Sequence, residues 1–161
     1  QARAAGINVV PVPGACALIA ALSAAGLPSD RFIFEGFLPA KAVGRRARLE
    51  SIKEEPRTLI FYEAPHRILE CLQDMELVFG PERPALLARE LTKQFEEVAT
   101  LEASAAPAWL AADANRSRGE FVLVLHAMAA EETAALDAAA ERSLTLLLAE
   151  LAKFKPAEFR A

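Results

Sequence analysis

Two apolar runs constrain the fold of this chain more than any other feature. Residues 58–62 read TLIFY, and residues 119–127 read GEFVLVLHA. Runs of this length without polar alternation are typical of strands that are buried on both faces of a sheet. Such a sheet must be covered by helices on both sides, so we expect an α/β layered domain.

Helical patterns alternate with strand patterns along the rest of the chain. Strands are expected at residues 7–12, 31–38, 58–62, 85–91, 97–101 and 119–127, and helices at 15–25, 41–55, 64–79 and 107–115. The side chains of two helices that are expected to face inwards are Leu49, Ile52, Ile68, Leu69, Leu72, Met75 and Leu77. The fourth and fifth strands are joined by a short polar loop, which favours an antiparallel pair. We therefore predict a mixed five-stranded sheet flanked by helices, with residues 7–12 belonging to a preceding domain.

Composition divides the chain into three parts at the LPSD linker and after Met128. Residues 1–30 are expected to close a preceding domain, residues 31–128 to form the α/β domain, and residues 129–161 to begin a truncated helical domain. The last part is rich in Ala, Leu and Glu, and the leucines at helical spacing are Leu144, Leu147, Leu148 and Leu151. The chain starts at Gln1 and ends without a helix-capping signal, so we expect both ends to be cuts through a longer protein.

The composition excludes several classes of protein. Apolar residues make up 53% of the chain and charged residues 25%, which argues against intrinsic disorder. The net charge of −4 leaves no globally basic surface for non-specific nucleic-acid binding. No apolar run reaches the roughly 18 residues of a membrane span. Cys16 and Cys71 form no CxxC or Cys/His cluster that would hold a metal, and we interpret Cys16 as a small buried residue and His126 as a packed histidine.

Candidate functional residues follow the expected strands. Glu63, His66 and Arg67 come directly after the TLIFY strand, and RELTK (89–93) follows another apolar strand. The turn PGAC (13–16) leads into the N-terminus of a helix. Because the ligand crevice of an α/β sheet lies beyond the carboxyl ends of strands, these three segments form the candidate site. The alternatives are a simple helix start for the first segment and plain surface turns for the others.

Four segments together resemble one family: VPVPGACALIAALSAAGLPSDRFIFEGFLPAK, PRTLIFYEAPHRI, LARELTKQFEEV and GEFVLVL. They are similar to the ribosomal RNA small-subunit methyltransferase I family, within the tetrapyrrole-methylase (class III methyltransferase) superfamily. The resemblance covers residues 1 to about 127 and only the latter part of that family's chain. It assigns residues 1–30 to the last strand and helix of the N-terminal domain that binds S-adenosylmethionine (SAM).

The resemblance implies an activity and its partners. Methyl transfer from SAM to the ribose 2′-oxygen of a cytidine in the decoding region of 16S ribosomal RNA is the implied reaction. The implied protein is a cytoplasmic homodimer that acts on the small ribosomal subunit, without a metal and without a membrane anchor.

The resemblance also implies roles for individual residues. The cofactor-binding residues that it indicates are Pro13, Gly14, Ala15, Cys16, Tyr62, Glu63, Glu90, Leu91, Thr92, Gly119, Glu120 and Phe121. Phe121 is expected to supply an apolar wall that excludes water. Because a ribose hydroxyl is a poor nucleophile at neutral pH, the reaction needs a base or a cation that stabilises the developing alkoxide. The candidates, among which the sequence does not choose, are Glu63, His66, Glu90 and Lys93.

A run of cations is the last feature of note. Lys41, Arg45, Arg46 and Arg48 occur without an acidic residue among them. The segment is either an RNA-binding patch that holds phosphates, to which Arg67 would add a fifth cation, or the solvated face of a helix.

Two other functions stay open at this stage. One is a superfamily enzyme that methylates a tetrapyrrole, another small molecule or a protein, although such a pocket needs no run of four cations. The other is a non-catalytic module for dimerisation or RNA binding. Because half of the cofactor cleft is missing, residues 1–161 alone are expected to be inactive and to bind SAM weakly.

Overall fold

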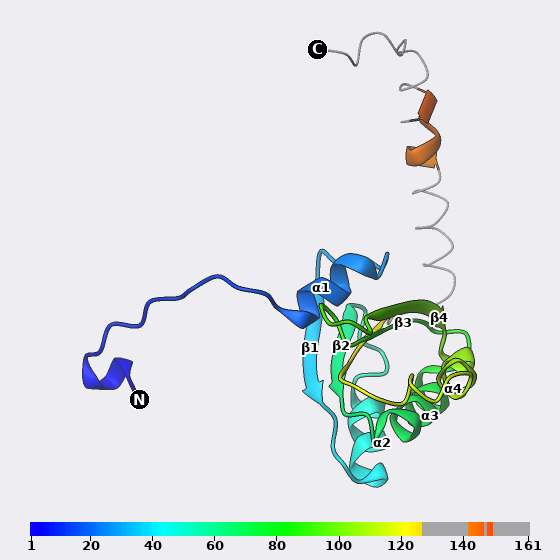
Figure 1. The fold of residues 1–161 in the computed structure, drawn as a ribbon, viewed down its shortest axis with the longest axis horizontal. Helices are drawn as coiled ribbons and strands as arrows, with labels where there is room; N and C mark the ends of the chain where they lie inside the picture. Colours follow the sequence, from blue (N-terminus) through cyan, green and yellow to red (C-terminus); the bar gives the residue numbers. More distant parts are fainter. Residues whose placement is uncertain (127–141, 147, 150–161) are drawn as a thin grey trace.

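A mixed sheet of five strands forms the centre of the structure (Figure 1). The computed structural model describes residues 1–126, 142–146 and 148–149. Within them the strands are β1 (Phe32–Phe37), β2 (Thr58–Glu63), β3 (Pro84–Arg89), β4 (Glu97–Glu102) and β5 (Phe121–Leu125). Their order is β1-β2-β5-β3-β4; β1 and β2 are parallel, and every other neighbouring pair is antiparallel. The predicted mixed five-stranded sheet is confirmed, including the antiparallel β3–β4 pair.

Helices cover both faces of this sheet. The helical elements of residues 1–126 are η1 (Arg3–Ala5), α1 (Ala17–Ala24), α2 (Ala42–Ser51), α3 (Ile68–Phe79), η2 (Ala103–Ala105) and α4 (Ala106–Ala111). One core lies between the sheet and α2, α3 and α4, and a second, smaller core lies between the sheet and α1 (Figure 1). Phe61 and Leu123 face the first core, whereas Ile60 and Val124 face the second. This alternation explains why β2 and β5 are apolar throughout.

Helix α3 begins later than the sequence pattern predicts. Residues 64–67 form a turn in which the Arg67 N–H donates to the Ala64 carbonyl at 3.0 Å, and the helix starts at Ile68. Leu69 and Leu77 are exposed, which corrects the predicted inward face. The buried residues of α3 are Ile68, Cys71, Leu72, Asp74, Met75, Val78 and Phe79. These positions recur every three or four residues from Ile68, as the buried stripe of a helix must, and the two leucines fall outside that stripe.

The expected strand at residues 7–12 is absent. These residues are exposed and carry no regular secondary structure, and the segment leads away from the sheet (Figure 1). A strand requires a neighbour that satisfies its N–H and C=O groups, and no strand in the described part of the chain lies beside this segment. Cys16, which lies between this segment and α1, is exposed rather than buried as predicted.

The C-terminal prediction lies largely outside the described residues. Residues 142–146 and 148–149 are helical, and Leu144 and Leu148 are exposed there. Leu147 and Leu151 are not described. In the described ranges no helix is both long and apolar enough to cross a bilayer. Those same ranges contain no group of three or more His, Cys, Asp or Glu side chains placed to hold a metal ion.

The position of the α3 stripe can be tested with two leucines of the same helix. Leu72 is 4% exposed and Leu77 is 66% exposed. We expect Leu72→Ala to lower the free energy of unfolding by about 2–5 kcal/mol, because it leaves a cavity in the larger core. Leu77→Ala should change the free energy of unfolding by less than about 0.5 kcal/mol. Urea unfolding followed by circular dichroism measures both, and equal losses would contradict the observed buried stripe of α3.

Candidate active site

The strand pairing brings the predicted site segments to one edge of the sheet, which we call the strand-end edge. Because β2 and β3 both run antiparallel to β5, their carboxyl ends lie together beside the amino end of β5. In register, Glu63 of β2 and Arg89 of β3 both lie opposite Phe121 of β5. The segments that follow Tyr62 and Arg89 and the segment that precedes Phe121 therefore converge, as the sequence predicts.

Glu63 is the buried anion of the strand-end edge. Its side chain is fully enclosed; Oε1 accepts a hydrogen bond from the Ala64 N–H at 2.8 Å, and Oε2 accepts one from Arg67 Nη2 at 3.2 Å. Arg67 Nη2 also donates to the Leu38 carbonyl at 2.6 Å. Burial, with a further contribution from Glu63, raises the pKa of the Cys71 thiol beside them, so that the thiol stays protonated. Glu63 and Arg67 thus hold one another inside the fold.

His66 does not join this pair. It is exposed on the turn between β2 and α3. The expectation that His66 and Arg67 occupy the first turn of a helix is wrong, because α3 begins after them and Arg67 is its N-cap residue. The RNA-binding patch expected from the sequence includes Arg67, whereas the structure pairs Arg67 with Glu63 and leaves the His66 imidazole outside that pair.

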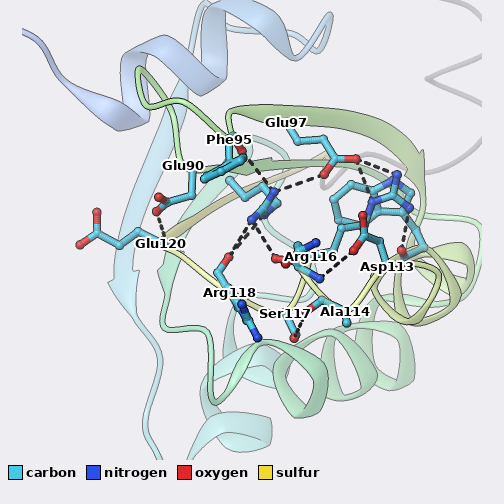
Figure 2. Close-up of polar contacts among 12 residues, drawn as sticks. Glu90, Phe95, Glu97, Asp113, Ala114, Arg116, Ser117, Arg118 and Glu120 are labelled. Atoms are coloured by element: carbon cyan, nitrogen blue, oxygen red, sulfur yellow. Dashed lines mark hydrogen bonds and ion pairs between the residues drawn. The ribbon is translucent and has the colours of Figure 1, made fainter.

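Glu90 forms the second polar group of the strand-end edge. Its backbone has φ 51°, and its N–H donates to the Glu120 carbonyl at 3.0 Å. Its carboxylate Oε1 accepts from the Glu120 N–H at 3.0 Å and from Lys93 Nζ at 2.9 Å. Lys93 Nζ also lies 3.1 Å from the carboxylate of Glu120. Figure 2 shows Glu90 and Glu120 side by side. Their carboxylates share the Lys93 ammonium.

The protonation states at Glu90 follow from these contacts. The hydrogen bond from Lys93, followed by that from the Glu120 N–H, lowers the pKa of Glu90. The hydrogen bonds to Glu90 and Glu120 raise the pKa of Lys93. At neutral pH the pair is therefore a carboxylate and an ammonium, so Lys93 is suited to stabilise negative charge rather than to accept a proton.

Gly119 is required by the packing at this point. Its φ is +87°, and a Cβ atom built on it would lie 2.3 Å from Cγ of Glu90. Thr92, in the loop after β3, also has a left-handed backbone (φ 65°), and its N–H donates to the Glu96 carboxylate at 2.5 Å. The loop that carries Glu90 and Lys93 therefore has one tightly fixed shape.

The α1 side of the strand-end edge is apolar. Leu18, Tyr62 and Leu91 are half-buried against the smaller core. The Tyr62 hydroxyl accepts a hydrogen bond from the Leu18 N–H at 3.2 Å, and its ring contacts Phe34 at 4.8 Å between centroids. The predicted turn Pro13, Gly14, Ala15 and Cys16 is exposed and immediately precedes α1. Phe121 is 1% exposed in the larger core, so only its main chain can reach a ligand, and its predicted role as an apolar wall is wrong.

The cationic run is largely paired with acids from other elements. Arg45 is 1% exposed, and its Nε lies 2.5 Å from the Asp74 carboxylate, which also accepts from Arg46 Nε at 2.6 Å. Arg48 pairs with Glu35 of β1 at 2.7 Å. Arg45 therefore anchors α2 to α3 and is not available to RNA phosphates, whereas Lys41 is exposed.

Sequence reasoning missed the part played by Arg89. This buried guanidinium donates to main-chain carbonyls of two loops: Asn115 at 2.8 Å, Phe95 at 3.1 Å and Arg118 at 3.2 Å (Figure 2). It also lies 3.4 Å from Glu97. The loops at residues 90–96 and 112–120 are thus tied together behind Glu90. The partners of Arg89 are main-chain carbonyls, which every residue type carries. No residue pattern in the sequence could therefore indicate this contact.

Comparison with known proteins defines the class to which this chain belongs. Residues 1–107 match the family described as Tetrapyrrole (Corrin/Porphyrin) Methylases, and the chain belongs to that family. The methyltransferase CobJ shares the fold at 20% identity (TM-score 0.53, covering 76% of this chain and 52% of CobJ). The cobalt precorrin-4 methyltransferase CbiF shares it at 13% identity (TM-score 0.56, covering 76% of this chain and 54% of CbiF).

Within that class, two curated relatives of high identity carry the same name. The chain is 63% identical to the ribosomal RNA small subunit methyltransferase I of Pseudomonas aeruginosa, over 100% of this chain and 57% of the relative. It is 54% identical to the protein of the same name from Escherichia coli O157:H7, over 99% of this chain and 55% of the relative. The resemblance drawn from the sequence is confirmed. The chain spans about half the length of these relatives.

The role of Arg89 can be tested by removing its donors. We expect Arg89→Met to lower the free energy of unfolding by about 2–3 kcal/mol, because carbonyls of both loops lose their partner. Amide hydrogen exchange should quicken in residues 90–96 and 112–120 more than in β2. The matched control is Arg83→Met, since Arg83 lies at the opposite end of β3 and donates to the Phe79 carbonyl. Equal amide exchange of these two loops in both variants would contradict the role of Arg89 in tying them together.

The contact between Glu90 and Lys93 can be tested through the pKa of the Glu90 carboxyl. In Lys93→Met the pKa of Glu90 should rise towards its ordinary value of 4.5, but not fully, because the Glu120 N–H still donates to it. The stability that the pair contributes is present above the ordinary glutamate pKa and is lost as the pH falls through the lowered one. Carboxyl ¹³C NMR measures the shift, with Lys53→Met as the control. An unchanged Glu90 midpoint would show that Lys93 does not hold this carboxylate.

Proposed function

We propose that the protein containing this chain transfers a methyl group from SAM to the ribose 2′-oxygen of a cytidine in the decoding region of 16S ribosomal RNA. The observation that carries the proposal is the 63% identity, along the whole chain, to a protein named ribosomal RNA small subunit methyltransferase I. The strand-end edge supports it, because polar groups and an apolar rim meet where ligands bind in α/β folds. We further propose that it acts in the cytoplasm as a homodimer on the small ribosomal subunit.

The strand-end edge suits SAM on its α1 side. Leu18, Tyr62 and Leu91 offer a half-buried apolar rim for an adenine. The turn 13–16 leads into α1 from the same side and would contribute main-chain donors. Bound SAM supplies an electrophilic methyl group on a sulfonium. The residues of this chain bind and orient it and exclude water from one side.

The polar residues of the edge divide into positioning and reacting groups. Glu63 is enclosed and bonded to Arg67, so it fixes the end of β2. Lys93, held by Glu90, is the cation that we place near the 2′-oxygen, where it stabilises the negative charge that develops as the proton leaves. His66 is exposed and is the side chain we propose as proton acceptor. His66 would accept the proton that the 2′-hydroxyl loses when it takes the methyl group that bound SAM would supply.

RNA phosphates would meet the exposed cations of the domain. Lys41 is exposed, and Arg46 and Arg48 keep about half of their side-chain surface exposed beside their acidic partners (54% and 47%). Arg67 can approach the backbone only through its partly exposed side, because its guanidinium is engaged with Glu63. Phosphate contacts of this kind position an RNA without reading its sequence.

The full-length protein tests the proposal. It should transfer labelled methyl groups from SAM to unmethylated small ribosomal subunits and not to a tetrapyrrole. Lys93→Met should lower kcat by about 100-fold, as loss of a charge-stabilising group does in comparable sites, and Lys93→Arg should retain part of the rate. Lys53→Met serves as the control for loss of an exposed ammonium. Methylation of a tetrapyrrole instead of the ribosomal subunit would refute the proposal.

A further inference from the structure

A pocket of about 620 Å³ lies beside the strand-end edge, between the two loops that Arg89 ties together. It shares Glu90 and Gly119 with that edge and continues to Phe95 and Asp113. Its volume falls within the range of small-molecule sites. The roles assigned above to Glu90 and Gly119 use only the inner end of this space.

The lining of the pocket is rich in hydrogen-bond acceptors. Glu96, Glu97 and Asp113 contribute carboxylates, although that of Glu96 already accepts from the Thr92 N–H and that of Glu97 pairs with Arg89 and Arg116. Arg89 donates to main-chain carbonyls, and Arg118 adds an exposed cation to the lining. Asp113 uses Oδ1 to accept from the Asn115 N–H at 2.8 Å, which leaves acceptor capacity on its carboxylate. Carboxylates repel phosphate but accept hydrogen bonds from the exocyclic amino groups of bases. The carboxylate side of the pocket therefore suits the edge of a nucleobase, and the exposed Arg118 offers a cation for the adjoining phosphate.

Phe95 supplies a flat surface at the pocket. Its residue is 66% exposed, although its carbonyl is fixed by Arg89 Nη1 at 3.1 Å (Figure 2). The ring is thus exposed while its main chain is anchored. Splayed-out bases of single-stranded RNA stack on aromatic side chains held in this way.

We propose that this pocket takes one unpaired nucleobase of the RNA substrate, next to the nucleotide that is methylated. The base stacks on Phe95 and directs an amino group towards the carboxylate of Asp113. The inference rests on the proposed function, which supplies the RNA, and adds a site for a second nucleotide. A base carrying an exocyclic amino group (cytosine, adenine or guanine) fits these carboxylates better than uracil, which offers them only its N3–H donor.

Four variants of the full-length protein test this site. Phe95→Ala should raise the KM for small ribosomal subunits at least tenfold, because stacking on one base is lost. Phe95→Trp should stay within about threefold of wild type, since any aromatic ring can stack. Asp113→Asn should weaken RNA binding without a change in the Kd for SAM. Leu77→Ala, which truncates an apolar residue with the same 66% exposure on α3, should change nothing.

The outcomes separate the inference from the function on which it rests. If the wild-type protein methylates no ribosomal subunit, the proposed function fails and the inference fails with it. If wild type is active and Phe95→Ala matches it in KM, only the inference is overturned. A loss of SAM affinity in Phe95→Ala would place the ring in the cofactor site instead. A change of oligomeric state without a change in RNA affinity would place it in a protein interface. Either result overturns the base site.

Discussion

The pairing of β5 between β2 and β3 is the contact on which the rest of the structure depends. β5 is the last strand of the sheet in the sequence, yet it lies in the middle. Its antiparallel register sets Glu63 and Arg89 on either side of Phe121. Without β5, the carboxyl ends of β2 and β3 would have no common neighbour, and the two polar segments would not meet. One strand thus completes both cores and aligns the candidate site.

Arginine side chains carry much of the polar cohesion around this sheet. Arg45 binds Asp74, Arg67 binds Glu63 and the Leu38 carbonyl, and Arg89 binds carbonyls of two loops. A guanidinium suits such positions because it offers five N–H donors in a fixed plane and stays charged when enclosed. The consequence for function is that several cations of this chain serve its interior. Those left for a ligand are at the surface, such as Lys41, Lys93 and Arg118.

Local pattern sufficed for the elements whose apolar residues face the cores of this chain. The two apolar runs gave β2 and β5 to within a few residues, and the short polar loop gave the antiparallel β3–β4 pair. The segment at residues 7–12 has the composition of a strand, but pairing depends on a neighbour that composition does not reveal. The cationic run was separated from its acids in sequence, since Asp74 and Glu35 lie on α3 and β1. The number of cations counted along the sequence therefore overstated the positive charge that this part of the surface presents.

The candidate site also has parts that the sequence predicted and parts that it did not. The sequence brought Glu63, Glu90 and Gly119 to one edge, because strand ends are visible as the points where apolar runs stop. It did not separate His66 from Glu63, since Pro65 is equally typical of the second position of a turn, where the structure has it, and of the first position of a helix. Nor did it reveal the Arg89 clamp, whose partners are main-chain atoms. Local sequence pattern therefore did not predict the tertiary contacts between charged side chains and the backbone.

The strained backbone of the loop after β3 has its cause within this chain. Glu90 and Thr92 both adopt left-handed conformations that L-residues with side chains seldom occupy. Such conformations persist only where surrounding contacts hold them. Here the Glu120 main chain pairs with Glu90, the Glu96 carboxylate binds the Thr92 N–H, and Arg89 fixes the end of the loop at the Phe95 carbonyl. The free energy that orients Lys93 therefore comes from folding and not from ligand binding. A charge-stabilising group that is in place before the ligand arrives needs no reorganisation during the reaction, which is the condition under which such a group accelerates it most.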